Sequence, residues 1–137
     1  MSETQNDKDA WAAYSDAMPK IAGIPTTAGT GSEGGKSAVI TNTDGVKVVF
    51  GNTLFMPKTV ALVPQFTVRL PPHLTAATGI DALFHNLEAY FVPKAAAYRD
   101  GMSDEDIQVA DDYALKGIQL IVHNLPKAFI QVIHLYD

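Results

Sequence analysis

The chain changes character at the consecutive prolines Pro71 and Pro72, and this change constrains the fold more than any other feature of the sequence. Before the prolines, short runs rich in β-branched residues alternate with Gly, Thr, Asn and Asp, which is typical of strands and turns. After them, apolar residues recur at helical spacing. Because prolines end regular elements, we expect strands up to about residue 70 and helices beyond it.

Four short segments of the first part predict strands. Ile21–Ile24 and Val60–Val63 are apolar runs, and both are expected to be buried strands. Between them, Ser37–Thr41 and Val46–Phe50 flank an Asp-Gly turn at residues 42–45. Asp-Gly between β-branched runs predicts a β-hairpin.

The second part predicts two helices separated by a loop. Leu74–Phe91 has a helical pattern, in which Gly79 is expected to mark a joint. Pro93–Met102 is expected to be a loop. Ser103 followed by three carboxylates is a strong helix start, because the hydroxyl caps the first turn and acidic groups favour its positive end.

This last helix is expected to run from about Asp104 to His123 and to end at Asn124-Leu125-Pro126. A further short amphipathic helix is expected at Ala10–Met18, where Trp11 and Tyr14 stand at helical spacing.

Composition excludes several classes of protein. Of the 137 residues, 47% are hydrophobic and 18% charged, which is typical of a globular domain. The net charge is -5, so the chain has no excess of positive charge with which to bind nucleic acid or an anionic membrane surface. The chain contains no cysteine, no apolar run long enough to span a membrane and no secretory signal at its polar N-terminus. We therefore expect a cytoplasmic protein with no nucleic-acid or membrane partner.

The stretch IPTTAGTGSE at Ile24–Glu33 contributes little to a core, because most of its side chains are small or hydroxylated. A loop after a strand can present successive backbone N–H groups to an anion, and Gly29 and Gly31 would permit close approach. The loop is neither a P-loop nor a G-x-G-x-x-G motif. From its own pattern it is either an anion-binding loop or a turn-rich connector. Its hydroxyl-bearing residues are Thr26, Thr27, Thr30 and Ser32.

Asp81 and His85 are four residues apart, so on a helix their side chains share one face. A carboxylate oxygen with an imidazole nitrogen suits Fe(II) or Zn(II) better than Ca(II). Two ligands do not complete a metal site. Glu88 is a third ligand, a partner that orients the imidazole, or a solvated helix charge. On spacing alone an ordinary surface pair is the simpler interpretation, and both interpretations stay open.

Taken together, IPTTAGTGSE followed by LPPHLTAATGIDALFHNLEAY resembles the iron-containing (group III) alcohol dehydrogenase family. The correspondence runs from about Ile21 to Ala128. It implies an α/β, dehydroquinate synthase-like architecture, in which short strands and a hairpin end a Rossmann-like cofactor domain and the first helices of an all-helical metal-binding domain follow. The implied division is an unassigned polar segment at 1–20, the cofactor domain at 21–70 and the metal domain at 71–137.

The resemblance also implies roles for individual residues. Asp81 and His85 would be two of four protein ligands to a divalent metal, usually iron and sometimes zinc, which acts as a Lewis acid. Hydride would pass between a small alcohol or aldehyde and the nicotinamide of NAD or NADP. The residues expected to contact this cofactor are Thr26, Thr27, Gly29, Thr30 and Gly31.

The chain departs from the family at both ends. Nothing in residues 1–20 resembles the glycine-rich phosphate loop of the family, and His123 and His134 do not stand where its two remaining metal-binding histidines would. Phe129–Asp137 does not resemble the continuation of the family. We therefore expect a truncated segment with little dehydrogenase activity of its own.

Two alternatives stay open. A truncated relative would expose apolar helix faces and could act without catalysis as an interaction or oligomerisation module, pairing with a second copy or with a full-length partner. A metal hydrolase built on Asp81 and His85 lacks a third ligand and a general base.

Overall fold

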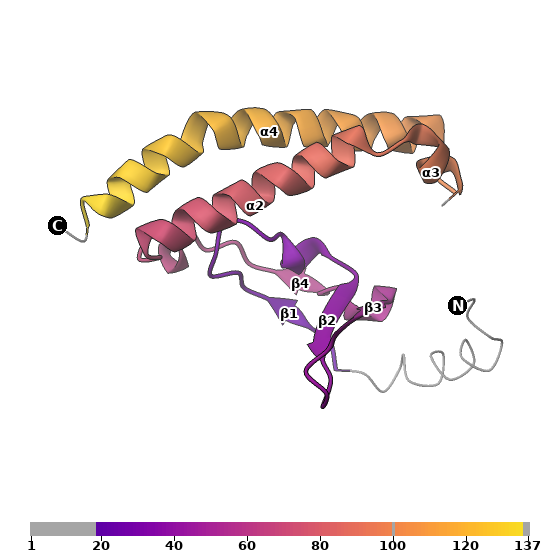
Figure 1. Ribbon diagram of the computed structural model, residues 1–137, viewed down its shortest axis with the longest axis horizontal. Helices are drawn as coiled ribbons and strands as arrows, with labels where there is room; N and C mark the ends of the chain where they lie inside the picture. The colour runs from indigo at the N-terminus through magenta and orange to yellow at the C-terminus, as the bar shows by residue number, and fades with distance from the viewer. Residues whose placement is uncertain (1–18, 100, 136–137) are drawn as a thin grey trace. The chain divides into compact units, whose positions relative to one another are not determined.

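The computed structural model of the protein describes residues 19–99 and 101–135 (Figure 1). The helix predicted at Ala10–Met18 lies outside the described residues. The described residues form two compact units, one from residues 19–25 and 32–62 and the other from residues 26–31, 63–99 and 101–135. Strands lie in the first unit and α-helices in the second, so the predicted α/β class is confirmed. The predicted domain division at residues 20 and 70 stays a prediction.

The first unit contains a short parallel pair of strands, β1 (Ala22–Gly23) and β4 (Thr59–Val60). Each is two residues long: β1 lies inside the predicted strand Ile21–Ile24, whereas β4 shares only Val60 with the predicted strand Val60–Val63. Their predicted burial is wrong, because Ile24 is 53% exposed and Leu62 is 69% exposed. The reason is that β1 and β4 pair only with each other in the described part of the chain, and a two-stranded sheet has little apolar surface to bury.

The predicted hairpin is confirmed as an antiparallel pair of β2 (Ser37–Thr41) and β3 (Lys47–Gly51). Its turn is organised by Asn42, whose Oδ1 accepts hydrogen bonds from the backbone N–H groups of Asp44 (3.0 Å) and Val46 (2.9 Å). Gly45 has a φ of 78°, a conformation that few other residues adopt easily. The turn therefore forms from local interactions, which explains why its sequence pattern was informative.

Short 3₁₀ turns occupy the remaining connections of the described chain. They are η1 (Ser32–Gly34), η2 (Thr53–Phe55) and η3 (Pro64–Phe66). Asn52 caps η2, because its Oδ1 accepts a hydrogen bond of 2.9 Å from the Leu54 N–H.

Helix α2 spans Pro72–Phe91 without interruption, so the predicted joint at Gly79 is wrong. Gly79 is buried, and a Cβ atom at this position would overlap the side chain of Leu125 on α4. The glycine therefore lets two helices approach closely and does not break one of them. The helix ends before Pro93, since the residue before a proline disfavours the helical conformation.

The loop predicted at Pro93–Met102 contains a short helix, α3 (Lys94–Arg99), so this prediction is wrong. The sequence KAAA after Pro93 explains the difference, because proline is favoured at helix starts and alanine has the highest helix propensity. The Tyr98 hydroxyl donates a hydrogen bond to the Asp104 carboxylate at the start of the next helix.

Helix α4 spans Asp104–Ile133, and its predicted start is confirmed. Ser103 and Asp106 form a reciprocal capping box, in which the Asp106 N–H donates to Ser103 Oγ (3.2 Å) and the Ser103 N–H donates to Asp106 Oδ2 (3.0 Å). The Ser103 hydroxyl also donates to Asp106 Oδ2 at 2.6 Å.

The predicted end of this helix is wrong, because α4 continues through Pro126 to Ile133. A proline inside a helix costs roughly 3 kcal/mol, since it removes a hydrogen bond and crowds the preceding turn. Burial of side chains beyond Pro126 offsets this cost, at about 1.5–3 kcal/mol for each large apolar side chain fully removed from water. Val132 is 7% exposed, which makes it one such side chain.

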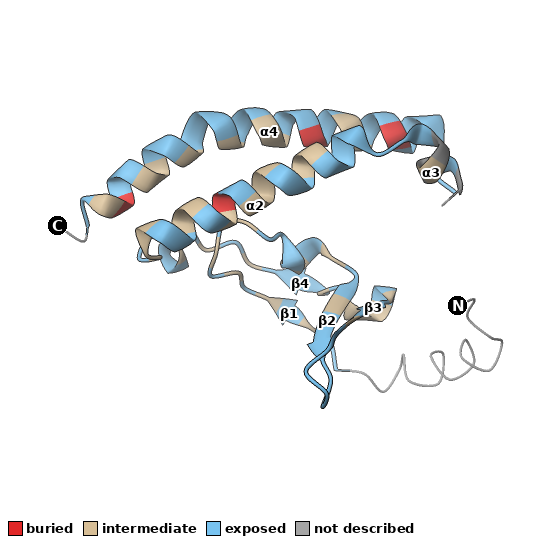
Figure 2. Ribbon diagram, viewed as in Figure 1, coloured by how far each residue is buried: buried red, intermediate tan, exposed pale blue. Residues whose placement is uncertain are grey.

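Helices α2 and α4 pack antiparallel and form the core of the second unit (Figures 1 and 2). Gly79 on α2 faces Leu125, and about two turns further along α2 the Asn86 side chain faces Gly117. The face of α4 that is buried or half-buried repeats at alternating steps of four and three residues, the spacing of a helix seam. Its members are Ile107, Asp111, Ala114, Ile118, Ile121, Leu125, Ala128 and Val132.

Within residues 19–99 and 101–135, no helix combines the length and the apolar composition that a bilayer span requires.

The capping box makes stability depend on pH in a predictable direction. Hydrogen bonds from Ser103 hold the pKa of the Asp106 carboxyl below its usual range. Such a group stabilises the fold above its unfolded pKa, near 4, and this contribution is lost as the pH falls through its folded pKa. We expect the melting temperature, measured by circular dichroism, to fall below about pH 4, and to fall less in Asp106→Asn.

The matched control is Glu105→Gln, in the same turn but outside the capping box. Its melting temperature should fall with pH as that of the wild-type protein does. If the melting temperature of Asp106→Asn falls just as steeply below pH 4, this account of the cap is wrong.

Candidate metal and cofactor site

The Thr/Gly loop of residues 26–31 belongs to the same compact unit as α2 and α4. It touches α2 at Thr78, because a Cβ atom on Gly29 would overlap the backbone carbonyl oxygen of Thr78. Gly31 has a φ of 63°, a conformation that favours glycine. The two glycines thus serve the structure directly, one through backbone contact with the helix and the other through its conformation.

Exposure alternates along this loop. Thr27 and Gly29 are half-buried, whereas Thr26, Ala28 and Thr30 are exposed. The loop therefore touches α2 at Gly29, while Thr26 and Thr30 are exposed.

The structure brings Asp81 and His85 together on α2. Their side chains share one face, with His85 Nδ1 3.6 Å from Asp81 Oδ2, and they are 53% (His85) and 45% (Asp81) exposed. This distance is too long for a good hydrogen bond, and a half-exposed ion pair of this kind contributes little to stability. The arrangement is thus not explained by a strong structural role for the pair.

The geometry of the pair matches two ligands of one divalent ion. Two donors each about 2.1 Å from a tetrahedral ion lie roughly 3.4 Å apart, close to the separation seen here. Imidazole nitrogen and carboxylate oxygen are both common ligands of iron and zinc. Asp81 and His85 therefore fit part of a metal site without a large rearrangement.

The loop and this pair lie on one side of α2. Thr78, which the loop contacts, is three residues before Asp81 and seven before His85, and these spacings keep all three on the same side of a helix. The structure therefore places the contact between loop and helix about one turn from the metal-binding candidates.

The chain does not complete a metal site within its described part. Among residues 19–99 and 101–135, no group of three or more His, Cys, Asp or Glu side chains could hold a metal ion. Glu88 therefore does not join Asp81 and His85 as a third ligand in this structure. Of the remaining histidines, His73, His123 and His134 are all exposed, and His123 Nε2 lies 2.6 Å from Lys127 Nζ.

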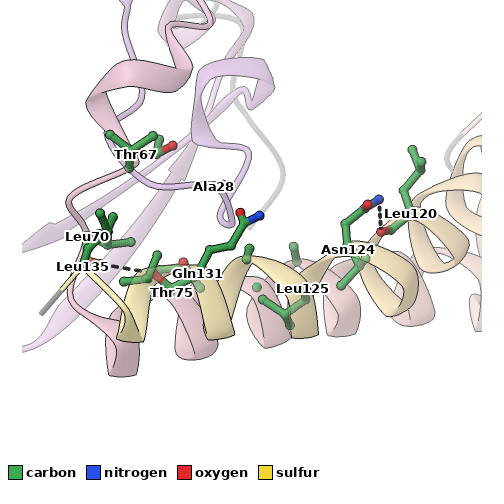
Figure 3. Close-up of a pocket in the computed structure, with 16 residues that line it drawn as sticks. Ala28, Thr67, Leu70, Thr75, Leu120, Asn124, Leu125, Gln131 and Leu135 are labelled. Carbon is green, nitrogen blue, oxygen red and sulfur yellow. Dashed lines mark hydrogen bonds between the residues drawn. The ribbon is translucent and has the colours of Figure 1, made fainter. Parts of the chain in front are cut away.

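Sequence patterns did not predict a pocket of about 520 Å³ in the second unit (Figure 3). Its walls come from Ala28 of the loop, from Thr67, Val68 and Leu70, from the first half of α2, and from the second half of α4 with Leu135 beyond it. The small residues Thr75, Gly79 and Ala82 of α2 are the signal that could have indicated it, because small side chains on a helix face leave space beside a partner helix.

Comparison with known proteins points to one family. Residues 3–64 match the family described as iron-containing alcohol dehydrogenase. This match begins well before Ile21, so the resemblance extends further toward the N-terminus than the motifs alone indicate. The chain spans about a quarter of the length of the curated relatives it matches.

Individual relatives agree with this family. The chain is 40% identical over 111 residues to long-chain-alcohol dehydrogenase 1 of Geobacillus thermodenitrificans (strain NG80-2), covering 81% of this chain and 25% of that protein. Because 111 of 137 residues are aligned, the alignment includes at least residues 27–111, and therefore both Asp81 and His85.

Two solved structures resemble the fold. A 1,3-propanediol oxidoreductase has a TM-score of 0.70 and 37% identity, covering 82% of this chain and 27% of that chain. Sulfoacetaldehyde reductase from Bifidobacterium kashiwanohense, solved in complex with NAD+, has a TM-score of 0.52 and 28% identity, covering 82% of this chain and 30% of that chain.

The contact between the loop and α2 can be tested with Gly29→Ala. The added methyl group would collide with the Thr78 carbonyl, and backbone atoms cannot move aside as the end of a flexible side chain can. We expect the loop to move away from α2, with amide chemical-shift changes and faster hydrogen exchange at residues 26–31 and around Thr78.

Gly34→Ala is the matched control, since a Cβ atom there would meet nothing within 4 Å. Equal shift changes in the two variants would show that Gly29 does not hold the loop against the helix.

Proposed function

Because the chain belongs, over its central segment, to the iron-containing alcohol dehydrogenase family, we propose that it contributes to metal-dependent, NAD(P)-linked interconversion of an alcohol and an aldehyde. The observation that carries this proposal is the placement of Asp81 and His85 side by side on α2, about one turn from the helix position that the Thr/Gly loop contacts.

In this proposal, Asp81 and His85 hold a divalent metal, iron in the first place and zinc as the alternative. Their exposed side chains leave room for further ligands, which the described residues do not supply. When bound, the metal polarises the substrate oxygen as a Lewis acid and the nicotinamide exchanges hydride with the substrate carbon. Asp81 and His85 would fix the position of the metal on a rigid helix face.

The loop is proposed to bind the dinucleotide. Exposed threonine hydroxyls and glycine backbone N–H groups are suitable donors for phosphate oxygens. Support comes from the NAD+ complex of sulfoacetaldehyde reductase and from the match of residues 3–64, which includes the whole loop. The residues proposed to contact NAD or NADP are Thr26, Thr27, Gly29, Thr30 and Gly31.

A metal titration tests the first part of the proposal. Zn²⁺, and Fe²⁺ under anaerobic conditions, should shift the imidazole NMR signals of His85 in the wild-type protein. Asp81→Ala should weaken binding by at least about tenfold, because one of two ligands is lost, and His85→Ala should do the same.

His73→Ala is the matched control, since His73 is an exposed histidine in the first turn of the same helix. It should leave the affinity unchanged. If His73→Ala weakens binding as much as His85→Ala does, or if Asp81→Ala has no effect, the metal assignment is wrong.

A second function, as a non-catalytic interaction module, has support of its own. Several large apolar side chains on the helices are exposed, among them Tyr113 at 71%, Val122 at 61% and Phe84 at 58%. Exposed apolar surface of this kind favours association with another polypeptide, and a second copy of the chain is the simplest partner.

Association is measured by sedimentation of the purified chain over a range of concentrations. We expect the wild-type mass to rise with concentration and Tyr113→Glu to lower the mass toward that of the monomer, because a buried charge opposes association. A wild-type chain that stays monomeric and folded at every concentration would exclude this second function.

A further inference from the structure

The hairpin of β2 and β3 has two outer edges that could accept a further strand. Within residues 19–99 and 101–135, β2 pairs only with β3. The other strand pair, β1 with β4, has only two residues in each strand, which leaves little edge for another chain to bind. Among the described residues, the hairpin therefore offers the longest strand edges.

The hydrogen bonds of the hairpin show which backbone groups point outward. The Asn42 N–H donates to the Val46 carbonyl (2.9 Å), and the Asn52 N–H donates to the Lys36 carbonyl (2.9 Å). Because alternate residues of an antiparallel strand bond to the partner strand, the even-numbered residues of β2 bond to β3. The residues whose N–H and C=O groups point away from β3 are Ser37, Val39 and Thr41.

The outer edge of β2 lacks the features that usually prevent strand pairing. Proteins commonly block exposed edges with lysine or proline. Strand β2 has the sequence SAVIT and contains neither, whereas β3 begins with Lys47. The side chains of Val39 and Ile40 are 61% and 53% exposed. Of the two edges, that of β2 is therefore better suited to pairing.

The sequence of β2 is complementary to itself. Antiparallel pairing of two copies about a two-fold axis at Val39 sets this valine opposite its own counterpart. The same register sets Ala38 opposite Ile40, and Ser37 opposite Thr41. A small side chain then meets a large one, a hydroxyl meets a hydroxyl, and no charge meets a like charge. A second copy of the chain therefore fits this edge.

Charges beyond the strand ends are also complementary in this register. Lys36 directly precedes β2 and would stand opposite Asn42 of the other copy, at the start of the turn. The charged residue of that turn is Asp44, and both Lys36 and Asp44 are exposed. The two-fold axis repeats this approach of opposite charges, so it occurs twice in one pair of chains.

From these observations we propose that the outer edge of β2 is a self-association surface, at which two copies of the chain pair antiparallel across a two-fold axis at Val39. The outward N–H and C=O groups of each β2 strand bond to those of the other, and the two hairpins form one four-stranded sheet. This contact is independent of metal and dinucleotide binding, and it is separate from the association proposed for the exposed helix residues around Tyr113.

Sedimentation of Tyr113→Glu measures the β2 contact alone, because association through the helices is weakened in this variant. We expect its mass to rise with concentration and to stop at that of a dimer, since a two-fold contact is closed. Adding Val39→Lys should weaken this association at least about tenfold, because two like charges would stand directly opposite each other.

Val49→Lys is the matched control. Val49 lies opposite Val39 within the hairpin and is 67% exposed. In the four-stranded sheet the two introduced lysines would be three strand spacings apart, roughly 14 Å, so association should change little. An equal mixture of Val39→Lys and Val39→Glu, both in the Tyr113→Glu background, should associate more strongly than either variant alone.

Amide hydrogen exchange tests the same contact without a change in the hairpin. As the concentration of Tyr113→Glu is raised, exchange should slow at the outward N–H groups of Ser37, Val39 and Thr41. Exchange at Ile40, which already bonds to β3, should change less. This measurement decides the matter even if Val39→Lys does not fold.

Three results would overturn the proposal. They are a Tyr113→Glu chain that stays monomeric at every concentration, equal weakening by Val49→Lys and Val39→Lys, and exchange at Val39 that does not depend on concentration. If the wild-type chain associates and Tyr113→Glu does not, the β2 contact is excluded while the association through the helices is supported, so the two can fail separately.

Discussion

Close contact between α2 and α4 is the interaction on which the second unit depends. Two glycines make it close, since Gly79 accommodates Leu125 and Gly117 accommodates the Asn86 amide. A larger residue at either position would have to displace the side chain of Leu125 or of Asn86 from the seam, which buries Ile107, Ala114 and Val132. The seam also fixes the rotation of α2 about its own axis. That rotation decides which residues remain available for binding.

The candidate site follows from this rotation. With Gly79, Ala82 and Asn86 turned toward α4, the residues on the neighbouring side of α2 are Thr78, Asp81 and His85. Thr78 supports the loop, and the other two carry the donor atoms proposed for a metal. One side of α2 therefore packs against α4, and the neighbouring side contacts the loop and carries the two residues proposed as metal ligands. Few exchanges of residues between those sides would be tolerated.

Features set by neighbouring residues were predictable from the sequence. The hairpin turn depends on Asn42 and Gly45, and the start of α4 depends on Ser103 and Asp106, all within a few positions of one another. The proximity of Asp81 and His85 is predictable for the same reason, since helix geometry alone brings residues four apart together. The loop and the pair also carried the resemblance to the family.

Features set by distant contacts were not predictable. From the sequence, Gly79 indicates a helix joint. Its role depends instead on Leu125, which is distant in the sequence and lies against it. Pro126 has the local features of a helix end, and the helix continues past it to the buried side chain of Val132. That placement has a mechanical consequence. Proline cannot donate to the carbonyl of Val122, so the turn before it lacks one of the bonds that make a helix stiff. The final turns of α4, which form part of the pocket wall, therefore follow a turn that is held by one hydrogen bond fewer than a regular helical turn.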